Sequence, residues 1–160
     1  MLIETEGDIL LSKATALAHG VAVDDDFKQG LALKLREQWP SLYKDFRHYC
    51  QTSSPNEGSV WSWKGAGGPA ILNLFTQAPP PQKGGHPGKA SLSNVNHALK
   101  NLATTLQTEG YKSVALTRLA TGVGGLEWKD VKPLVEKHLG ALPIKVYVYT
   151  KFVKDQAGEK

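Results

Sequence analysis

The residues from Leu116 to Trp128 have the composition of an anion-binding loop. They begin as an apolar strand, continue as a loop that contains Gly122, Gly124 and Gly125, and end where an amphipathic helix starts. Glycine has no Cβ, so backbone N–H groups in such a loop can approach a ligand closely. The N-terminus of the next helix adds partial positive charge, which favours phosphate. Because many loops carry glycine for turn geometry alone, a plain turn is the alternative.

A histidine and an acidic run in the first part of the chain could also take part in chemistry. His19 ends an apolar stretch, and Asp24, Asp25 and Asp26 follow it closely. His19 could donate or accept a proton near neutral pH, although a structural histidine with satisfied hydrogen bonds is the alternative. The aspartates predict a solvated loop, with a role in orienting water or binding ribose hydroxyls as the alternative. We predict no metal site, since adjacent side chains rarely converge on one ion.

The composition predicts a single domain. The chain has 160 residues, 41% of them hydrophobic, which is enough for a substantial core. No apolar run is long enough to span a membrane, and the acidic start of the chain does not have the pattern of a signal peptide. The single cysteine, Cys50, excludes an intrachain disulfide and favours a cytoplasmic location. The net charge of +4 comes from scattered lysines and predicts a solvated surface, so direct nucleic-acid binding is not favoured.

Hydrophobic periods of two and of 3.6 residues alternate along the chain, which predicts alternating strands and helices. The expected strands cover residues 2–5, 14–21, 60–63, 71–75, 114–116 and 144–149. A helix is expected over 30–39, where Pro40 should stop it, and a second, short helix is expected after a cap at Ser41. Two more helices are expected from Ser91 to Gly110 and over 128–139. The proline-rich residues 77–88 predict a surface loop. This pattern indicates an α/β fold whose mixed, mostly parallel sheet is covered by helices on both faces.

In this order, several short motifs resemble those of the macro domain family. They are Gly7-Asp8-Ile9-Leu10 after the first strand, Leu17-Ala-His19, Gly30-Leu-Ala32, the loop from Thr117 to Trp128, and Val146-Tyr-Val-Tyr149. The resemblance covers essentially the whole chain and implies a three-layer αβα fold with ADP-ribose across the carboxyl ends of the strands. The macro domain is expected over residues 1–152, and the mostly polar residues 153–160 predict a frayed tail.

The same resemblance implies roles for individual residues. Asp8 would accept a hydrogen bond from the adenine amino group, helped by the Ile9 backbone, and Tyr149 or Phe152 would border the adenine. His19 would be the catalytic candidate. The diphosphate and distal ribose would lie against two loops, through Gly30, Leu31, Thr121, Gly122, Val123, Gly124, Gly125 and Leu126. The resemblance implies no cofactor, and the expected partner is ADP-ribose or an ADP-ribosylated macromolecule.

Within the family, the chain is most similar to terminal ADP-ribose glycohydrolases, DNA ADP-ribosyl antitoxins and yeast-type ADP-ribose phosphate phosphatases. It departs from the glycohydrolases at two positions, because Gln77 stands where they carry a lysine and Gly124 where they carry an acid. The first loop keeps only Gly30 of several glycines, so bulk there could narrow the pocket. Lys83 and His86 lie in the 77–88 loop, which either covers the site or is a plain surface loop.

Three functions follow from this interpretation. The first is an ADP-ribose-binding domain that hydrolyses ADP-ribose phosphate or ADP-ribosyl adducts with help from His19. The second is a non-catalytic reader of ADP-ribosylated partners, which the replacements at Gln77 and Gly124 favour. The third, a nucleic-acid-binding module, has the least support because the sequence contains no recognisable basic stripe or stacking module.

Overall fold

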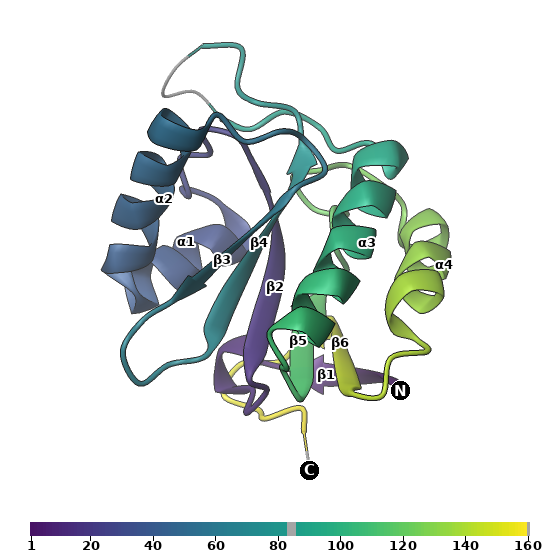
Figure 1. Ribbon diagram of the computed structural model, residues 1–160. Helices are drawn as coiled ribbons and strands as arrows, with labels where there is room; N and C mark the ends of the chain where they lie inside the picture. The colour runs from purple at the N-terminus through teal and green to yellow at the C-terminus, as the bar shows by residue number, and fades with distance from the viewer. Residues whose placement is uncertain (83–85, 160) are drawn as a thin grey trace.

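The protein folds into three layers, with a six-stranded sheet between two pairs of helices (Figure 1). The computed structural model describes residues 1–82 and 86–159. The strands are β1 (Leu2–Gly7), β2 (Ala16–Ala22), β3 (Val60–Lys64), β4 (Ala70–Gln77), β5 (Ser113–Thr117) and β6 (Lys145–Phe152). The helices are α1 (Gly30–Gln38), α2 (Pro40–Ser53), α3 (Leu92–Thr108) and α4 (Trp128–Leu139), with a short 3-10 helix, η1 (Ile9–Leu11). The predicted three-layer α/β architecture is confirmed.

The order of strands brings most of the strand ends to one edge of the sheet. The order is β1-β6-β5-β2-β4-β3, and β3 runs antiparallel to β4 while the other neighbours are parallel. In an open α/β sheet, ligands bind beyond the carboxyl ends of the parallel strands. The loops that follow β1, β2, β4 and β5 therefore leave the sheet on the side where a ligand is expected.

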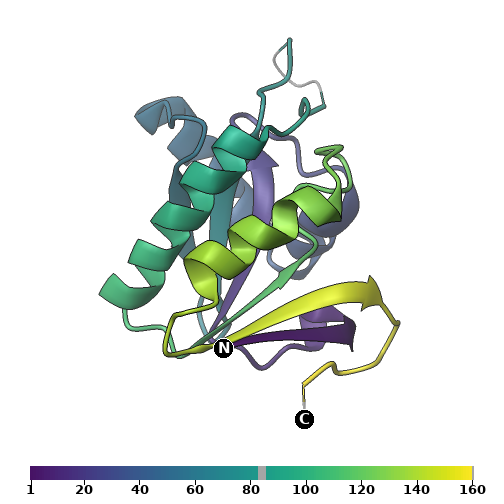
Figure 2. The same ribbon diagram turned by 90° about the vertical axis from the view of Figure 1, so that its right-hand side faces the viewer.

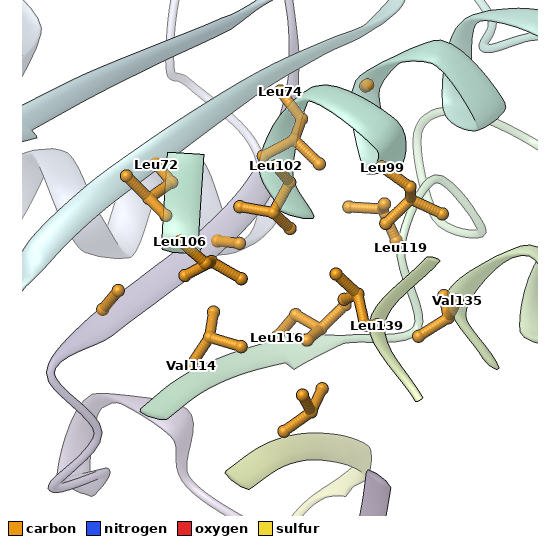
Figure 3. Close-up of a cluster of buried hydrophobic side chains, with 14 of the residues drawn as sticks. Leu72, Leu74, Leu99, Leu102, Leu106, Val114, Leu116, Leu119, Val135 and Leu139 are labelled. Atoms are coloured by element: carbon orange, nitrogen blue, oxygen red, sulfur yellow. The ribbon is translucent and has the colours of Figure 1, made fainter. Parts of the chain in front are cut away.

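Two hydrophobic clusters hold the layers together, one on each face of the sheet. Figure 3 shows the cluster between the sheet and the helices α3 and α4, where Leu99, Leu102 and Leu106 pack against Leu72 and Leu116. The second cluster lies under α1 and α2 and contains three phenylalanines from different segments, Phe27, Phe46 and Phe75. Ala16 and Ala18 of β2 belong to the first cluster, and Leu17 and Val21 belong to the second. The predicted burial of this strand on both faces is confirmed.

Two local predictions are wrong, at Ser41 and at the start of β2. Helix α1 ends at Gln38, before Pro40 as expected, but α2 already begins at Pro40, so Ser41 lies inside α2 and does not cap it. Proline suits the first position of α2 because the first turn of a helix leaves its N–H groups unpaired. Strand β2 begins at Ala16 rather than Ala14, because Thr15 bonds to Ser113 through both its backbone and its side chain.

The end of the chain is packed against the sheet, so the expected frayed tail is wrong for residues 153–159. After β6 the chain turns back beside β1 (Figure 2). The Asp8 N–H donates to Gln156 O at 2.8 Å, and Thr5 Oγ1 donates to Gly158 O at 2.6 Å. The Tyr149 hydroxyl donates to the Glu159 carboxylate. The division of the chain at residue 152 stays a prediction.

Within residues 1–82 and 86–159, no helix combines the length and the apolar character that crossing a membrane requires.

Candidate functional site

A cavity of about 150 Å³ lies where β2 and β5 separate at their carboxyl ends. The two strands pair from Ala16 to Ala18 of β2, whereas β2 stays paired with β4 as far as Ala22. The loops after β2 and β5 and the start of α1 surround the opening. Residues lining the cavity include His19, Gly20, Asp25, Gln29, Gly30, Leu31, Ala32, Gln77, Pro87, Thr117, Arg118, Leu119, Ala120, Gly122, Val123 and Gly124.

The cavity brings together only part of the site predicted from the sequence. His19, Gly30, Leu31 and the segment Gly122–Gly124 contribute to its lining. Among the described residues, the other predicted site residues do not line the cavity; they are Asp8, Ile9, Thr121, Gly125, Leu126 and Tyr149. Their roles therefore depend on a ligand that extends beyond this cavity.

The residues expected around adenine lie at the ends of β1 and β6. Asp8 is half-buried, and its Oδ1 accepts a hydrogen bond from Leu10 N at 3.0 Å, which caps η1. Tyr149 is buried beneath the returning residues 156–159, whereas Phe152 is 55% exposed at the end of β6. The Lys34 Nζ lies 3.9 Å from the centroid of the Phe152 ring. Of the two aromatic candidates, Phe152 thus presents the accessible ring.

The second loop covers residues 118–127, between β5 and α4. Packing requires one of its glycines, and another faces open space. A Cβ on Gly124 would lie 2.6 Å from Ala120 O, which is too close for any real contact. A Cβ on Gly122 would have no described atom within 4 Å. Ala120 has a φ of 63°, a left-handed conformation that costs a residue with a Cβ roughly 1–2 kcal/mol. Such strain is typical of ligand sites, where the surrounding structure holds the backbone in place.

The first loop covers residues 23–29, between β2 and α1, and hydrogen bonds to its own aspartates stabilise it. The prediction of a solvated acidic loop is therefore wrong for Asp25 and Asp26. The two carboxylate oxygens of Asp25 accept from Ala22 N at 3.1 Å and Phe27 N at 2.9 Å, and Asp26 Oδ1 accepts from Lys28 N. Both side chains are buried, and burial raises the pKa of Asp25. The carboxylates satisfy backbone N–H groups that the loop would otherwise leave unpaired.

Phe27, in the loop between β2 and α1, is not among the described residues that line the cavity. It is fully buried at a φ of 51°, and its ring packs under α2 against Phe46, with 4.6 Å between centroids. The edge of Phe27 also meets the ring of His19, with centroids 5.6 Å apart. Because the ring points into the core, the expected narrowing of the pocket by this residue does not follow from its bulk.

His19 is held in one tautomer by Asn73, a residue that sequence reasoning missed. The Asn73 Nδ2 donates to Trp61 O at 3.1 Å and Ile71 O at 3.3 Å, so Oδ1 is the acceptor that faces His19 Nε2 at 2.6 Å. Nε2 must therefore carry the proton, and Nδ1 carries a lone pair with no described partner. Burial lowers the pKa of His19 to about 4. A polar residue in the middle of the apolar stretch Ile71-Leu-Asn-Leu-Phe75 was the available signal.

The proline-rich loop contributes one wall of the cavity and reaches the first loop. Gln77 Nε2 donates to Gly88 O at 3.1 Å, and Ala78 exchanges backbone hydrogen bonds with Gly88 and Lys89. His86 Nδ1 lies 3.0 Å from Asp26 Oδ2. Lys83 lies outside the described residues. Pro87 lines the cavity, so this loop is part of the candidate site.

The sheet carries two loops and a helix N-terminus at its carboxyl edge, where backbone N–H groups can face a ligand. This arrangement is typical of α/β folds that bind phosphates and nucleotides. The sequence of the chain identifies the family within that class. Residues 15–135 match the model of the Macro domain, so the chain belongs to the macro domain family.

Relatives and solved structures agree with this family. The chain is 27% identical to a DNA ADP-ribosyl transferase-DNA ADP-ribosyl glycohydrolase fusion protein of Thermosipho africanus, over 93% of the chain and 42% of that protein. It is also 27% identical to a DNA ADP-ribosyl glycohydrolase of Thermus aquaticus, over 93% of the chain and 41% of that protein. The chain thus spans less than half the length of these relatives.

The fold is similar to that of solved DarG macrodomains. The macrodomain of Thermus aquaticus DarG superposes with a TM-score of 0.81 and 25% identity, over 94% of this chain and 98% of that one. Thermosipho africanus DarTG, solved in complex with ADP-ribose, has a TM-score of 0.82 and 24% identity, over 95% of this chain and 41% of that one.

The buried His19 predicts a loss of stability in mild acid. Its pKa of about 4 lies below the ordinary value of 6.5, so the unfolded chain binds the proton first as the pH falls. The stabilising contribution is complete above pH 6.5 and decreases by about 3 kcal/mol as the pH falls through 4. Urea unfolding at pH 7 and pH 4.5 should show a smaller difference for His19→Gln than for the natural chain.

His138 provides the control, because its Nε2 also lies near an asparagine, at 2.7 Å from Asn96 Oδ1, but it is only half-buried. His138→Gln should leave most of the pH dependence in place. The raised pKa of Asp25 acts in the opposite direction and is common to all three proteins. Equal pH dependence in the natural chain and His19→Gln would contradict the buried, neutral state of His19.

Proposed function

We propose that this macro domain binds ADP-ribose at the carboxyl edge of its sheet. The observation that carries the proposal is the cavity between β2 and β5, where the start of α1 and the glycine loop converge. Backbone N–H groups in glycine loops and at helix N-termini stabilise phosphate without a lysine or arginine. Arg118 lines the same cavity and adds a cation to it. The similarity to DNA ADP-ribosyl glycohydrolases supports ADP-ribose over other phosphate ligands.

In the proposed pose, the adenine lies beside the ends of β1 and β6. Asp8 accepts from the adenine amino group, the Ile9 backbone assists, and Phe152 stacks on the base. Gly7 is paired with Phe152 across the two strands, which supports a common location for these groups. Tyr149 lies in the same strand as Phe152, and its hydroxyl donates to Glu159 beneath the proposed adenine site.

The diphosphate and the distal ribose lie deeper, over the start of α1. Gly30, Leu31 and the loop Thr121–Leu126 surround them in this pose. Gly122 leaves open space for a phosphate oxygen, since a side chain there would have no described neighbour within 4 Å. His19 Nδ1 has a buried lone pair with no described partner, and in this pose it accepts a hydrogen bond from a water rather than from the ligand.

The residues present support binding more strongly than lysine-dependent hydrolysis. Gln77 is buried, and its side-chain amide donates a hydrogen bond to Gly88 O. An amide nitrogen is not nucleophilic, so Gln77 cannot replace a lysine amine. Gly124 cannot gain an acidic side chain without moving the Ala120 carbonyl. A reader of ADP-ribosylated partners is therefore the second candidate function. At neutral pH His19 is unprotonated at Nδ1, so any hydrolysis would use it as an acceptor of a proton from water.

Asp8→Asn should weaken ADP-ribose binding by about tenfold or more while the fold is kept. Loss of a hydrogen bond to a buried group costs roughly 1–3 kcal/mol. Asparagine keeps the oxygen that caps Leu10 N, whereas Asp8→Ala would also remove this cap. Calorimetric titration with ADP-ribose measures the effect, and thermal unfolding checks that stability is unchanged. Equal affinity of Asp8→Asn and the natural chain would reject the adenine role of Asp8.

Gly122→Val should abolish detectable ADP-ribose binding, because the isopropyl group would fill the space assigned to the diphosphate. The substitution should leave the fold unchanged, since no described atom lies within 4 Å of the added Cβ and the φ of Gly122 is not left-handed. Gly124→Ala serves as a contrast that should lower stability instead, because its Cβ would meet Ala120 O. Normal titration of Gly122→Val with ADP-ribose would show that the diphosphate lies elsewhere.

We expect no lysine-dependent release of ADP-ribose from DNA or carboxylate adducts by the natural chain. Any hydrolysis of ADP-ribose phosphate should fall roughly 100-fold in His19→Ala, the usual size of a general-base contribution. ADP-ribose affinity should stay within about twofold, which marks a group that acts mainly in the transition state. Chromatographic assays of both substrates provide the measurement. Rapid adduct cleavage that survives His19→Ala would overturn this assignment.

A further inference from the structure

We infer that the basic groove between α1 and α2 holds a nucleic-acid strand to which the bound ADP-ribose is attached. This inference rests on the proposed function, because the ADP-ribose site fixes one end of the strand. It adds a second binding surface to that function, for the strand that carries the ADP-ribose. The surface is separate from the cavity between β2 and β5.

The groove is lined mainly by cationic and polar side chains from the two helices. It includes Arg36 of α1 and Tyr43, Lys44, Arg47 and His48 of α2, together with one acidic residue, Glu37 of α1. Lys44, Arg47 and His48 are exposed. Residues 28–51 contain five lysines and arginines but only two acidic residues, one of which, Asp45, accepts from Trp63 Nε1 at 2.8 Å. This 24-residue segment therefore carries most of the net charge of +4.

An arginine–tyrosine stack gives the groove a surface on which a base can lie. The Arg36 guanidinium carbon lies 3.9 Å from the centroid of the Tyr43 ring, and Arg36 Nη1 donates to Asp26 O at 3.0 Å. The stack and the hydrogen bond fix the plane of the guanidinium group. Single-stranded nucleic acids are recognised by stacking on aromatic rings and on arginine planes. Neighbouring Lys44 and Arg47 can contact phosphate on either side of such a base.

The groove leads directly away from the proposed ADP-ribose site. Helix α1 begins at Gly30 in the cavity, and Arg36 follows six residues later, about 9 Å along the helix. Leu33 of α1 lines the groove between these two points. A strand attached at the distal ribose can therefore enter the groove without crossing the sheet.

The acidic residues 24–26 lie beside the groove, and they restrict where a polyanion can bind without blocking the groove. Asp25 and Asp26 are buried and accept hydrogen bonds from backbone N–H groups. The exposed Asp24 faces a small hollow shared with Arg47 and Gln51. A polyanion is expected to stay on the Arg36 and Lys44 side of this hollow.

Nucleic acid fits these features better than an acidic protein segment does. Carboxylates on a peptide would use the cations of the groove but not the flat arginine–tyrosine surface. The similarity to enzymes that act on ADP-ribosyl groups of DNA points to the same partner.

The test compares two double variants with equal loss of charge. Lys44→Gln with Arg47→Gln removes two cations of the groove. Lys100→Gln with Lys137→Gln removes two exposed cations from α3 and α4, on the other face of the sheet. Fluorescence anisotropy with a labelled ten-nucleotide single-stranded DNA, from 25 to 200 mM salt, measures binding of the strand, and calorimetry measures binding of ADP-ribose.

We expect the groove variant to lose about tenfold in DNA affinity at low salt, and the slope of log K against log salt to fall by about 1.4, since two phosphate contacts are removed. The α3–α4 variant should change DNA affinity less than about twofold. Both variants should bind ADP-ribose like the natural chain. Equal losses in the two variants would overturn the inference, because net charge alone would then explain DNA binding.

Two further outcomes separate the inference from the function on which it rests. Competition by polyglutamate as strong as that by unlabelled DNA would overturn the assignment to nucleic acid and favour an acidic protein partner. Failure of the natural chain to bind ADP-ribose, with DNA binding that still depends on Lys44 and Arg47, would overturn the proposed function but support the groove.

Discussion

Burial of β2 on both faces is the constraint on which the rest of the structure depends. This strand pairs with β4 on one side and β5 on the other, and its side chains enter both hydrophobic clusters. Its pairing with β5 ends after Ala18, while its pairing with β4 continues to Ala22. The cavity is the consequence of this difference, because two strands that separate at their carboxyl ends leave a gap, which the adjoining loops and the start of α1 surround. The binding site is therefore built into the strand that organises the core.

A polar group in such a strand must be paired, and His19 shows how this requirement shapes the chemistry. Asn73, opposite His19 in the strand register, satisfies Nε2 and is itself held by two backbone carbonyls. An unpaired buried polar group would cost about 1–3 kcal/mol. The pairing leaves a neutral imidazole whose free lone pair accepts but does not donate. The same burial that stabilises the fold thus restricts His19 to a single role at neutral pH.

The sequence predicted the order of the elements, because hydrophobic period is a local signal, whereas the expected ligand position at the carboxyl edge came from the resemblance to macro domains. The sequence could not predict contacts that depend on distant segments. Asn73 meets His19 only through strand pairing, and Asp25 looked solvated because its backbone partners form only once the loop is closed. The returning residues 153–159 are polar, and nothing in their composition indicates the hydrogen bonds that hold them beside β1. Their apparent fraying was therefore a reasonable but incorrect prediction.

Charge shows the same dependence on tertiary structure. Along the chain the lysines and arginines look scattered, which argues for a solvated surface. The turn at Trp39–Pro40 folds α2 back on α1, so that Arg36 meets Tyr43 and lies in the same groove as Lys44 and Arg47. Short-range Coulomb attraction decays over about 10 Å at 0.1 M salt, so cations act together only when the fold brings them within that distance. A modest net charge therefore does not exclude a polyanion site, because what matters is how the fold distributes it.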